Sequence, residues 1–171
     1  MNMNWINRQA LIFMVATLTA LTSCNFNNRE QINDVMETST QIQDSLKAII
    51  HTVFDNSEEL NLESAFTPFW NDSNFFFVSN GIKSSYNELK KAEEEYFSSL
   101  KQQSFNFPFQ NFEVINQDNA ITNLVGTMIA VQKDGTTQKS NIAETIVFKK
   151  INNTWKIVSG HESYSPANET H

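Results

Sequence analysis

Cysteine, glycine and proline are scarce in this sequence. Its 171 residues include one cysteine, four glycines and three prolines. A single cysteine cannot form a disulfide within the chain, so side-chain packing has to hold the fold together. The low glycine and proline content argues against a disordered or loop-dominated protein. Fourteen phenylalanines supply enough apolar surface to build one core.

Basic residues are also scarce, and several catalytic motifs are missing. The net charge is −7 and no basic stretch stands out, so nucleic acid is not an expected partner. The sequence has no glycine-rich phosphate loop, no G-x-S-x-G elbow and no Cys/His metal spacing. Because the three histidines lie far apart, we expect neither a metal site nor a cofactor.

The N-terminal region has the pattern of an export signal. Ala10–Thr22 is apolar but shorter than the roughly 20 residues of a membrane span. It runs into Leu21–Cys24, which resembles the signal-peptide motif of bacterial lipoproteins. The resemblance implies cleavage before Cys24 and a diacylglycerol on its sulfur. The alternative is an ordinary secretory signal that is followed by a cysteine by chance.

These features divide the chain into four parts. We assign residues 1–23 to a lipoprotein signal peptide, 24–29 to a lipidated tether, 30–164 to a globular domain and 165–171 to a polar tail. The predicted location is the bacterial cell envelope. The membrane is then a partner through the acyl chains, because the acidic surface offers no attraction to anionic lipid.

A long amphipathic helix is predicted near the start of the domain. Apolar or small residues recur every three or four positions from Ile32 to Val53, which is the period of one helix face. We expect this helix to run from about Glu30 to Asp55 and to pack on a sheet. A coiled coil is the alternative, for which a short seam that contains Ser39 is marginal.

Two shorter helices should follow. Asn61 is a suitable N-cap for a short helix over residues 61–69. Ser85-x-x-Glu88 is a capping box that starts a helix ending near Leu100.

The second of these helices carries the acidic run Glu93-Glu94-Glu95. Successive helical residues point about 100° apart, so three in a row cannot converge on one ligand. We interpret all three as solvated surface.

The rest of the domain has the pattern of a curved antiparallel sheet. Phe75–Val78 is predicted to be a strand that ends in an Asn80-Gly81 turn. A phase shift in the apolar alternation beside Pro108 indicates a bulge. Gly126 interrupts a later strand, as a sharply curved sheet requires.

The chain closes with a hairpin made of Ile142–Phe148 and Trp155–Ser163, joined by a turn at Asn152-Asn153. Side chains alternate between the faces of a strand. One predicted face of the second strand therefore carries Trp155, Ile157, Ser159, His161 and Ser163. This face changes from bulky and apolar to small and polar, which indicates a strand that passes from the core into a cavity.

This hairpin resembles that of a known family. Its pattern is Trp155-x-Ile157-x-x-x-His161-x-Ser163, after a strand with Thr145 and Val147. The pattern is similar to the closing hairpin of the SnoaL-like group, in the nuclear transport factor 2-like (cystatin-like) superfamily, and the preceding elements follow in the same order. The resemblance implies an α+β cone, in which about three helices pack against a curved, mostly antiparallel sheet. Such cones host isomerases, dehydratases, hydrolases and non-catalytic binders.

The candidate pocket combines the polar end of the hairpin with one helix residue. Its predicted residues are His161, Glu144, Ser159, Ser163, Trp155 and Tyr96. An acid–base site would pair His161 with Glu144 if both side chains face inward. In the simpler alternative His161 is a hydrogen-bonded interior histidine, and an outward Glu144 is only a surface residue.

No complete catalytic set of the superfamily aligns with this sequence, so we expect binding rather than catalysis. The first hypothesis is non-catalytic binding of a small hydrophobic molecule or a protein partner at the envelope. The second is an acid–base enzyme of the isomerase, dehydratase or hydrolase type with a pocket around His161. The third is a structural adaptor that forms a homodimer through its sheet face.

Overall fold

The computed structural model describes residues 37–167. The predicted signal peptide, Cys24, the tether, the start of the long helix and the end of the tail lie outside the described residues. The elements in chain order are α2 (Ser39–Glu58), α3 (Leu62–Ala65), β1 (Phe76–Ser79), β2 (Ile82–Ser84), α4 (Tyr86–Ser99), β3 (Leu100–Asn116), β4 (Asn119–Gln132), β5 (Thr137–Ile151) and β6 (Thr154–Pro166).

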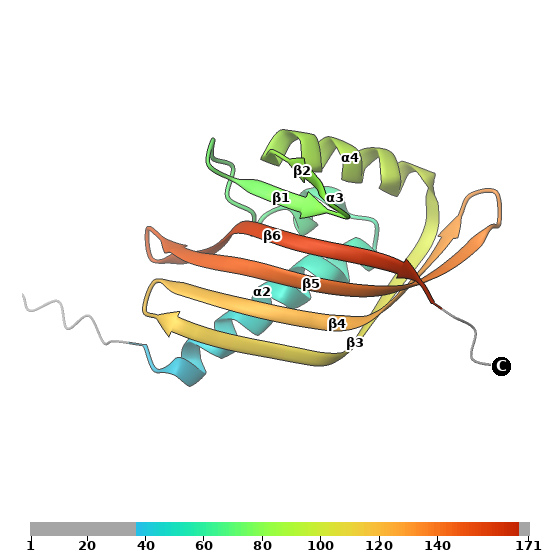
Figure 1. The fold of residues 1–171 in the computed structure, drawn as a ribbon. Coiled ribbons are helices and arrows are strands. Elements are labelled where there is room, and N and C mark those ends of the chain that lie inside the picture. Colours follow the sequence, from blue (N-terminus) through green and yellow to red (C-terminus); the bar gives the residue numbers. More distant parts are fainter. Residues whose placement is uncertain (1–36, 168–171) are drawn as a thin grey trace, which may run out of the picture. The chain divides into compact units, whose positions relative to one another are not determined.

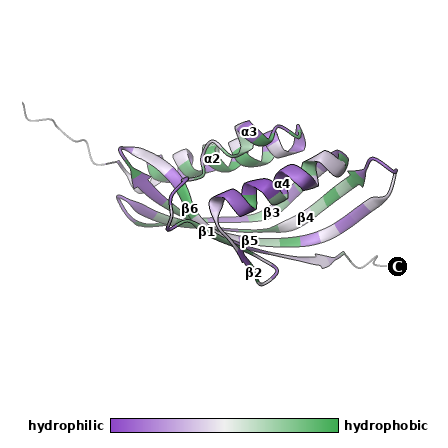
Figure 2. Ribbon diagram, turned by 90° about the horizontal axis from the view of Figure 1, so that it is seen from above, coloured by the Kyte–Doolittle hydropathy of each residue, from purple (hydrophilic) through white to green (hydrophobic). Residues whose placement is uncertain are grey.

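The strands form one six-stranded sheet in the order β2-β1-β6-β5-β4-β3 (Figure 1). All neighbours are antiparallel except β1 and β6, which are parallel. The three helices lie on one side of this curved sheet (Figure 2). The predicted α+β architecture is therefore confirmed. No helix within residues 37–167 has the length and hydropathy of a membrane span.

The long helix α2 starts later than predicted. Thr38 is its N-cap and forms a capping box with Gln41, so residue 37 precedes the helix rather than lying within it. The buried stripe of α2 packs on the inner face of β4, β5 and β6. Its members are Ile42, Leu46, Ile50 and Val53. The described part of this helix therefore covers the sheet, as the first of the two alternatives expects.

The other helix starts follow the local sequence. The Asn61 side chain caps α3 by accepting a hydrogen bond from the Ser64 backbone. Ser85 and Glu88 form the predicted capping box of α4. The helix predicted over residues 61–69 is shorter in the structure, because α3 ends at Ala65.

A bulge in β3 bends the sheet where the sequence predicts it. The pairing of β3 with β4 shifts between Asn106 and Phe109, beside Pro108. Gly126 of β4 lies against this bulge, and a Cβ atom there would come within 1.9 Å of the Asn106 carbonyl oxygen. The two strands can bend together only because residue 126 has no side chain.

A second bulge, in β6, was not predicted. Val147 pairs with Ser159 but Phe148 pairs with Ile157, so Val158 is an extra residue in β6. An extra residue exchanges the faces of a strand. Trp155 and Ile157 point into the core before the bulge, whereas the even-numbered residues point inward after it.

This bulge overturns the single face predicted for Trp155 to Ser163. Gly160 and Glu162 are buried, whereas His161 and Ser163 are exposed. Gly160 is needed on the inner face, since a Cβ atom there would lie 2.4 Å from the Phe77 ring.

The close approach at Gly126 gives a test of the bend. We expect Gly126→Ala to lower the free energy of unfolding by at least about 2 kcal/mol, because the obstacle is backbone and cannot turn away. The exposed neighbour Val125 supplies a matched control, and Val125→Ala should change stability by less than about 1 kcal/mol. Chemical denaturation of both variants measures this. If Gly126→Ala were as stable as Val125→Ala, β3 and β4 could move apart at this point without an energetic cost.

Candidate functional site

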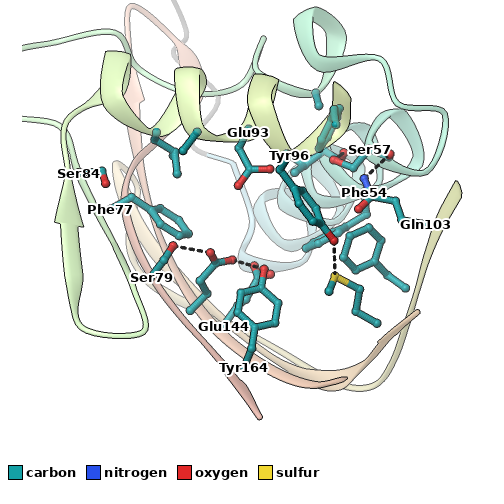
Figure 3. Close-up of a pocket in the computed structure, with 18 of the residues that line it drawn as sticks. Phe54, Ser57, Phe77, Ser79, Ser84, Glu93, Tyr96, Gln103, Glu144 and Tyr164 are labelled. Carbon is teal, nitrogen blue, oxygen red and sulfur yellow. Dashed lines mark hydrogen bonds between the residues drawn. The ribbon is translucent and has the colours of Figure 1, made fainter. Parts of the chain in front are cut away.

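A cavity of about 520 Å³ lies between the inner face of the sheet and the helices α2, α3 and α4. This volume is in the range of small-molecule sites. Most of its wall is apolar and aromatic, with contributions from every layer of the fold (Figure 3). Representative wall residues are Phe54, Phe77, Tyr96, Phe105 and Met128. The aromatic side chains thus leave a space rather than fill the cone.

Three glutamate side chains line this cavity, each from a different element. Glu93 comes from α4, Glu144 from β5 and Glu162 from β6. Glu144 and Glu162 are directly opposite each other in the β5–β6 register. Directly opposed residues on one face have Cβ atoms about 5 Å apart. Both are buried, with 7% and 8% of their surfaces exposed.

The two opposed carboxyl groups differ in their hydrogen bonds. Ser79 donates its hydroxyl to Glu162 Oε1, and the Tyr164 hydroxyl donates to Glu162 Oε2 at 2.8 Å (Figure 3). These two donors orient the Glu162 carboxyl. Among residues 37–167, no side chain or backbone group hydrogen-bonds to the Glu144 carboxyl, which leaves it available to a ligand.

No lysine, arginine or histidine of the described residues lines the cavity. His161, on the outer face of β6, acts on Glu162 through its charge and lowers the pKa of that carboxyl. Burial raises the pKa of Glu93 to about 7, and the Glu162 charge adds to this rise. Burial, followed by the charges of Glu162 and Glu93, raises the pKa of Glu144 well above its usual value. Burial also raises the pKa of Glu162, against the opposing effect of its hydrogen bonds with Ser79 and Tyr164.

Two tyrosines and one glutamine add further polar atoms. Tyr96 donates to the Met128 sulfur at 3.9 Å, and burial raises its pKa. Burial and the neighbouring carboxylates also raise the pKa of Tyr164. Gln103 donates from Nε2 to the Ser57 carbonyl oxygen at 2.6 Å, while its Oε1 atom has no partner in the described chain. The phenols therefore remain neutral donors around the acids.

Glu144 and Tyr96, two of the residues that the sequence nominated, line the cavity. Glu144 faces inward because Ile142, Glu144, Ile146 and Phe148 share the buried face of β5. The predicted partnership between Glu144 and a histidine does not form, since the residue opposite Glu144 is Glu162.

The other four nominated residues lie elsewhere. Trp155 is buried in the core cluster beneath α2, away from the cavity wall. Ser159 is half-buried, and His161 and Ser163 are exposed on the outer face. The β6 bulge at Val158 causes this reversal for the last three, because it turns the odd-numbered residues outward.

Sequence reasoning missed Glu162, Tyr164 and Glu93. The predicted alternation places Glu162 on the face opposite the candidate pocket, because the bulge has no signature in the sequence. Tyr164 lies just beyond the predicted strand. Glu93 had a usable signal: it lies four residues after Leu89 and three before Tyr96, on the apolar stripe of α4. The interpretation as solvated surface holds for Glu94 and Glu95, which are exposed, but not for Glu93, which lines the cavity.

The family model of the SnoaL-like domain matches residues 46–168, which contain the cavity and all six strands. The chain belongs to the SnoaL-like family. A comparison with curated proteins finds no match.

Solved structures share the fold of this SnoaL-like domain. A nuclear transport factor 2-like superfamily protein from Salmonella enterica is 16% identical with a TM-score of 0.67, and the match covers 78% of this chain and 96% of that one. A candidate dehydratase of the same family from Streptomyces avermitilis is 14% identical (TM-score 0.65; 77% and 100% covered). A candidate scytalone dehydratase from Novosphingobium aromaticivorans is 10% identical (TM-score 0.66; 76% and 88% covered). At these identities the similarity establishes the fold alone.

The raised pKa of Glu93 predicts a pH-dependent stability of the SnoaL-like domain. A carboxyl group with a higher pKa in the folded state binds more protons folded than unfolded between its ordinary value of 4.5 and about 7. The free energy of unfolding should therefore fall as the pH rises through this window. Glu93→Gln should remove part of this fall and be more stable than the native protein by about 2 kcal/mol at pH 8, with little difference at pH 4.5.

Urea denaturation at several pH values measures this effect. Glu94→Gln is the matched control, because Glu94 is the exposed neighbour on the same helix. It should keep the native pH dependence. An unchanged slope in Glu93→Gln would show that Glu93 ionises in the folded protein as it does in water.

Proposed function

We propose that this SnoaL-like domain binds a small, largely apolar molecule in its cavity, and that it does so at the bacterial cell envelope, held by a lipid on Cys24. The observation that carries the binding proposal is the 520 Å³ space itself. Protein interiors are normally packed without voids of this size, because an unfilled apolar cavity costs stability. A space with aromatic walls and a few buried polar groups has the composition of a ligand site.

The cavity opens to solvent beside α4. Ala92 is exposed and also lines the cavity, so it lies at the opening. A larger side chain at this position should obstruct entry while leaving the core intact. Glu95 lies on the same helix, is exposed, and is not a cavity residue. The two positions form a matched pair for a test of binding.

We expect the neutral dye N-phenyl-1-naphthylamine to bind with a saturable increase in fluorescence, because its emission rises in an apolar site. Ala92→Trp should weaken this binding by at least about tenfold, or about 1.4 kcal/mol, whereas Glu95→Trp should bind as the native protein does. Fluorescence titration measures both affinities. No saturable binding, or equal loss in both variants, would contradict the proposal.

The lipid anchor is supported by the motif Leu21–Cys24 alone. We expect the native chain, made in bacteria, to incorporate a fatty acid label and to carry Cys24 as its first residue. Cys24→Ser should abolish the label, while Ser23→Ala should retain it, since alanine is also small. Mass spectrometry of the N-terminal peptide measures both properties. An unlabelled chain cleaved elsewhere would instead identify an ordinary secretory signal.

Acid–base catalysis is the second candidate function. It is favoured by Glu93, whose pKa of about 7 suits a group that exchanges protons at neutral pH. Two solved proteins of this fold are described as candidate dehydratases. Turnover of a bound compound that is lost in Glu93→Gln and retained in Glu94→Gln would establish catalysis.

A homodimeric adaptor is the third candidate. Phe109 and Val125 are register partners on β3 and β4 and are 53% and 48% exposed. With Ile129 they form an apolar group on the side of the sheet opposite the helices. A dimer in sedimentation experiments that dissociates in Val125→Lys would support pairing through this face.

A further inference from the structure

The acidic side chains of the cavity have no basic residue beside them on the cavity wall. On the surface, Glu63 pairs with Lys90 at 2.8 Å and Glu37 pairs with Lys150 at 2.9 Å. In the cavity, three glutamates face the same space and none of the described lining residues is basic. The acids can be neutralised either by bound protons, which their raised pKa values favour, or by a cationic ligand in the cavity.

Among the three acids, Glu144 has the greatest need of a hydrogen-bond donor. It is 7% exposed and lies on the cavity wall, and the described chain makes no hydrogen bond to its carboxyl group. Its carboxyl oxygens are accessible from the cavity, because the fully buried side-chain polar atoms without a partner in the described chain are Gln103 Oε1 and Trp155 Nε1. Glu162, directly opposite, already accepts hydrogen bonds from Ser79 and Tyr164. Glu144 is therefore the group that a bound donor would satisfy.

We propose that the cavity selects an organic cation: a primary amine whose ammonium group lies among Glu144, Glu162 and Glu93, and whose apolar body occupies the aromatic part of the cavity. This inference rests on the proposed function, because it names the class of small molecule that the cavity binds.

The geometry favours an organic cation over a metal ion. Within residues 37–167, no three His, Cys, Asp or Glu side chains are close enough to coordinate one metal ion. An ammonium group needs only one or two close acceptors, and it can donate a hydrogen bond to Glu144 while the remaining acids contribute charge at longer range.

Aromatic residues lie next to the acids along the same elements. Tyr96 follows Glu93 by one turn of α4, and Phe77 lies two residues before Ser79, on the same face of β1. Figure 3 shows Phe77 and Tyr96 on either side of the carboxyl groups. Aromatic faces attract ammonium groups and also pack against an apolar chain, so both parts of the proposed ligand have a matching surface.

Binding should depend on pH, because an ammonium group stabilises the ionised form of the acids. The titratable groups facing the site are Glu93 and Tyr96 from α4, Glu144 from β5, and Glu162 and Tyr164 from β6. From the outer face of β6, His161 also acts on Glu162 through its charge. The lining residues of α2 and β3 are uncharged. The affinity for an amine should therefore rise from pH 5 to pH 8 as these carboxyl groups lose their protons, and binding should release protons.

Three probes with the same apolar body separate charge from hydrophobicity: 4-phenylbutylamine, 4-phenylbutan-1-ol and 4-phenylbutanoate. Isothermal titration calorimetry at pH 7.5 should give the amine at least about tenfold higher affinity than the alcohol, and no binding of the carboxylate. Titrations in phosphate and Tris buffers should give different heats, since protons are released. Glu144→Gln should remove the preference for the amine, and Glu94→Gln should retain it.

Each outcome bears on one of the two proposals. Equal binding of amine and alcohol would overturn the cation proposal and leave the binding function intact. Binding of N-phenyl-1-naphthylamine without displacement by the amine would do the same. Failure of the dye as well as all three probes would overturn both proposals. If thermal melting shows that Glu144→Gln is unfolded, Glu93→Gln replaces it, and a native amine preference in that variant would overturn the cation proposal.

Discussion

The extra residue in β6 is the constraint on which the rest of this structure depends. Val158 has no partner in β5, so β6 presents one set of side chains before it and the opposite set after it. The first half of the strand thereby contributes Trp155 and Ile157 to the core under α2. The second half contributes Glu162 and Tyr164 to the cavity. One strand thus serves two functions, because the bulge changes which face looks inward where the core ends.

Acidic side chains occupy inner-face positions that apolar residues would fill in a core, and their burial lowers the stability of the fold. Glu144 and Glu162 are opposed on neighbouring strands and lie in an environment that raises the pKa of both. Like charges directly opposite are destabilising in a sheet, and burial adds to this. The rest of the fold is specified by its local sequence. Capping boxes start α2 and α4, and Gly126 lets β4 bend against β3. Buried acids with raised pKa values that line a cavity are a feature often found at functional sites.

The fold of this molecule is shared with its family, whereas the site is described from its own side chains. The SnoaL-like match and the solved relatives establish the curved sheet and its three helices. The arrangement of the glutamates comes from this chain, and the proposals for its ligand rest on those side chains rather than on the relatives. Fold membership alone does not define a reaction.

By itself, the sequence determined the local features: the caps at Asn61, Ser85 and Glu88, and the bend at Gly126. These features depend on residues that can be recognised without knowledge of the partner strand. The sequence left open whether Glu144 faces the cavity, and the structure shows that it does. Only the tertiary structure decided which side of β6 faces the cavity. A bulge is defined by a mismatch between two strands, so a single strand carries no trace of it, and every side chain beyond it is assigned to the opposite face.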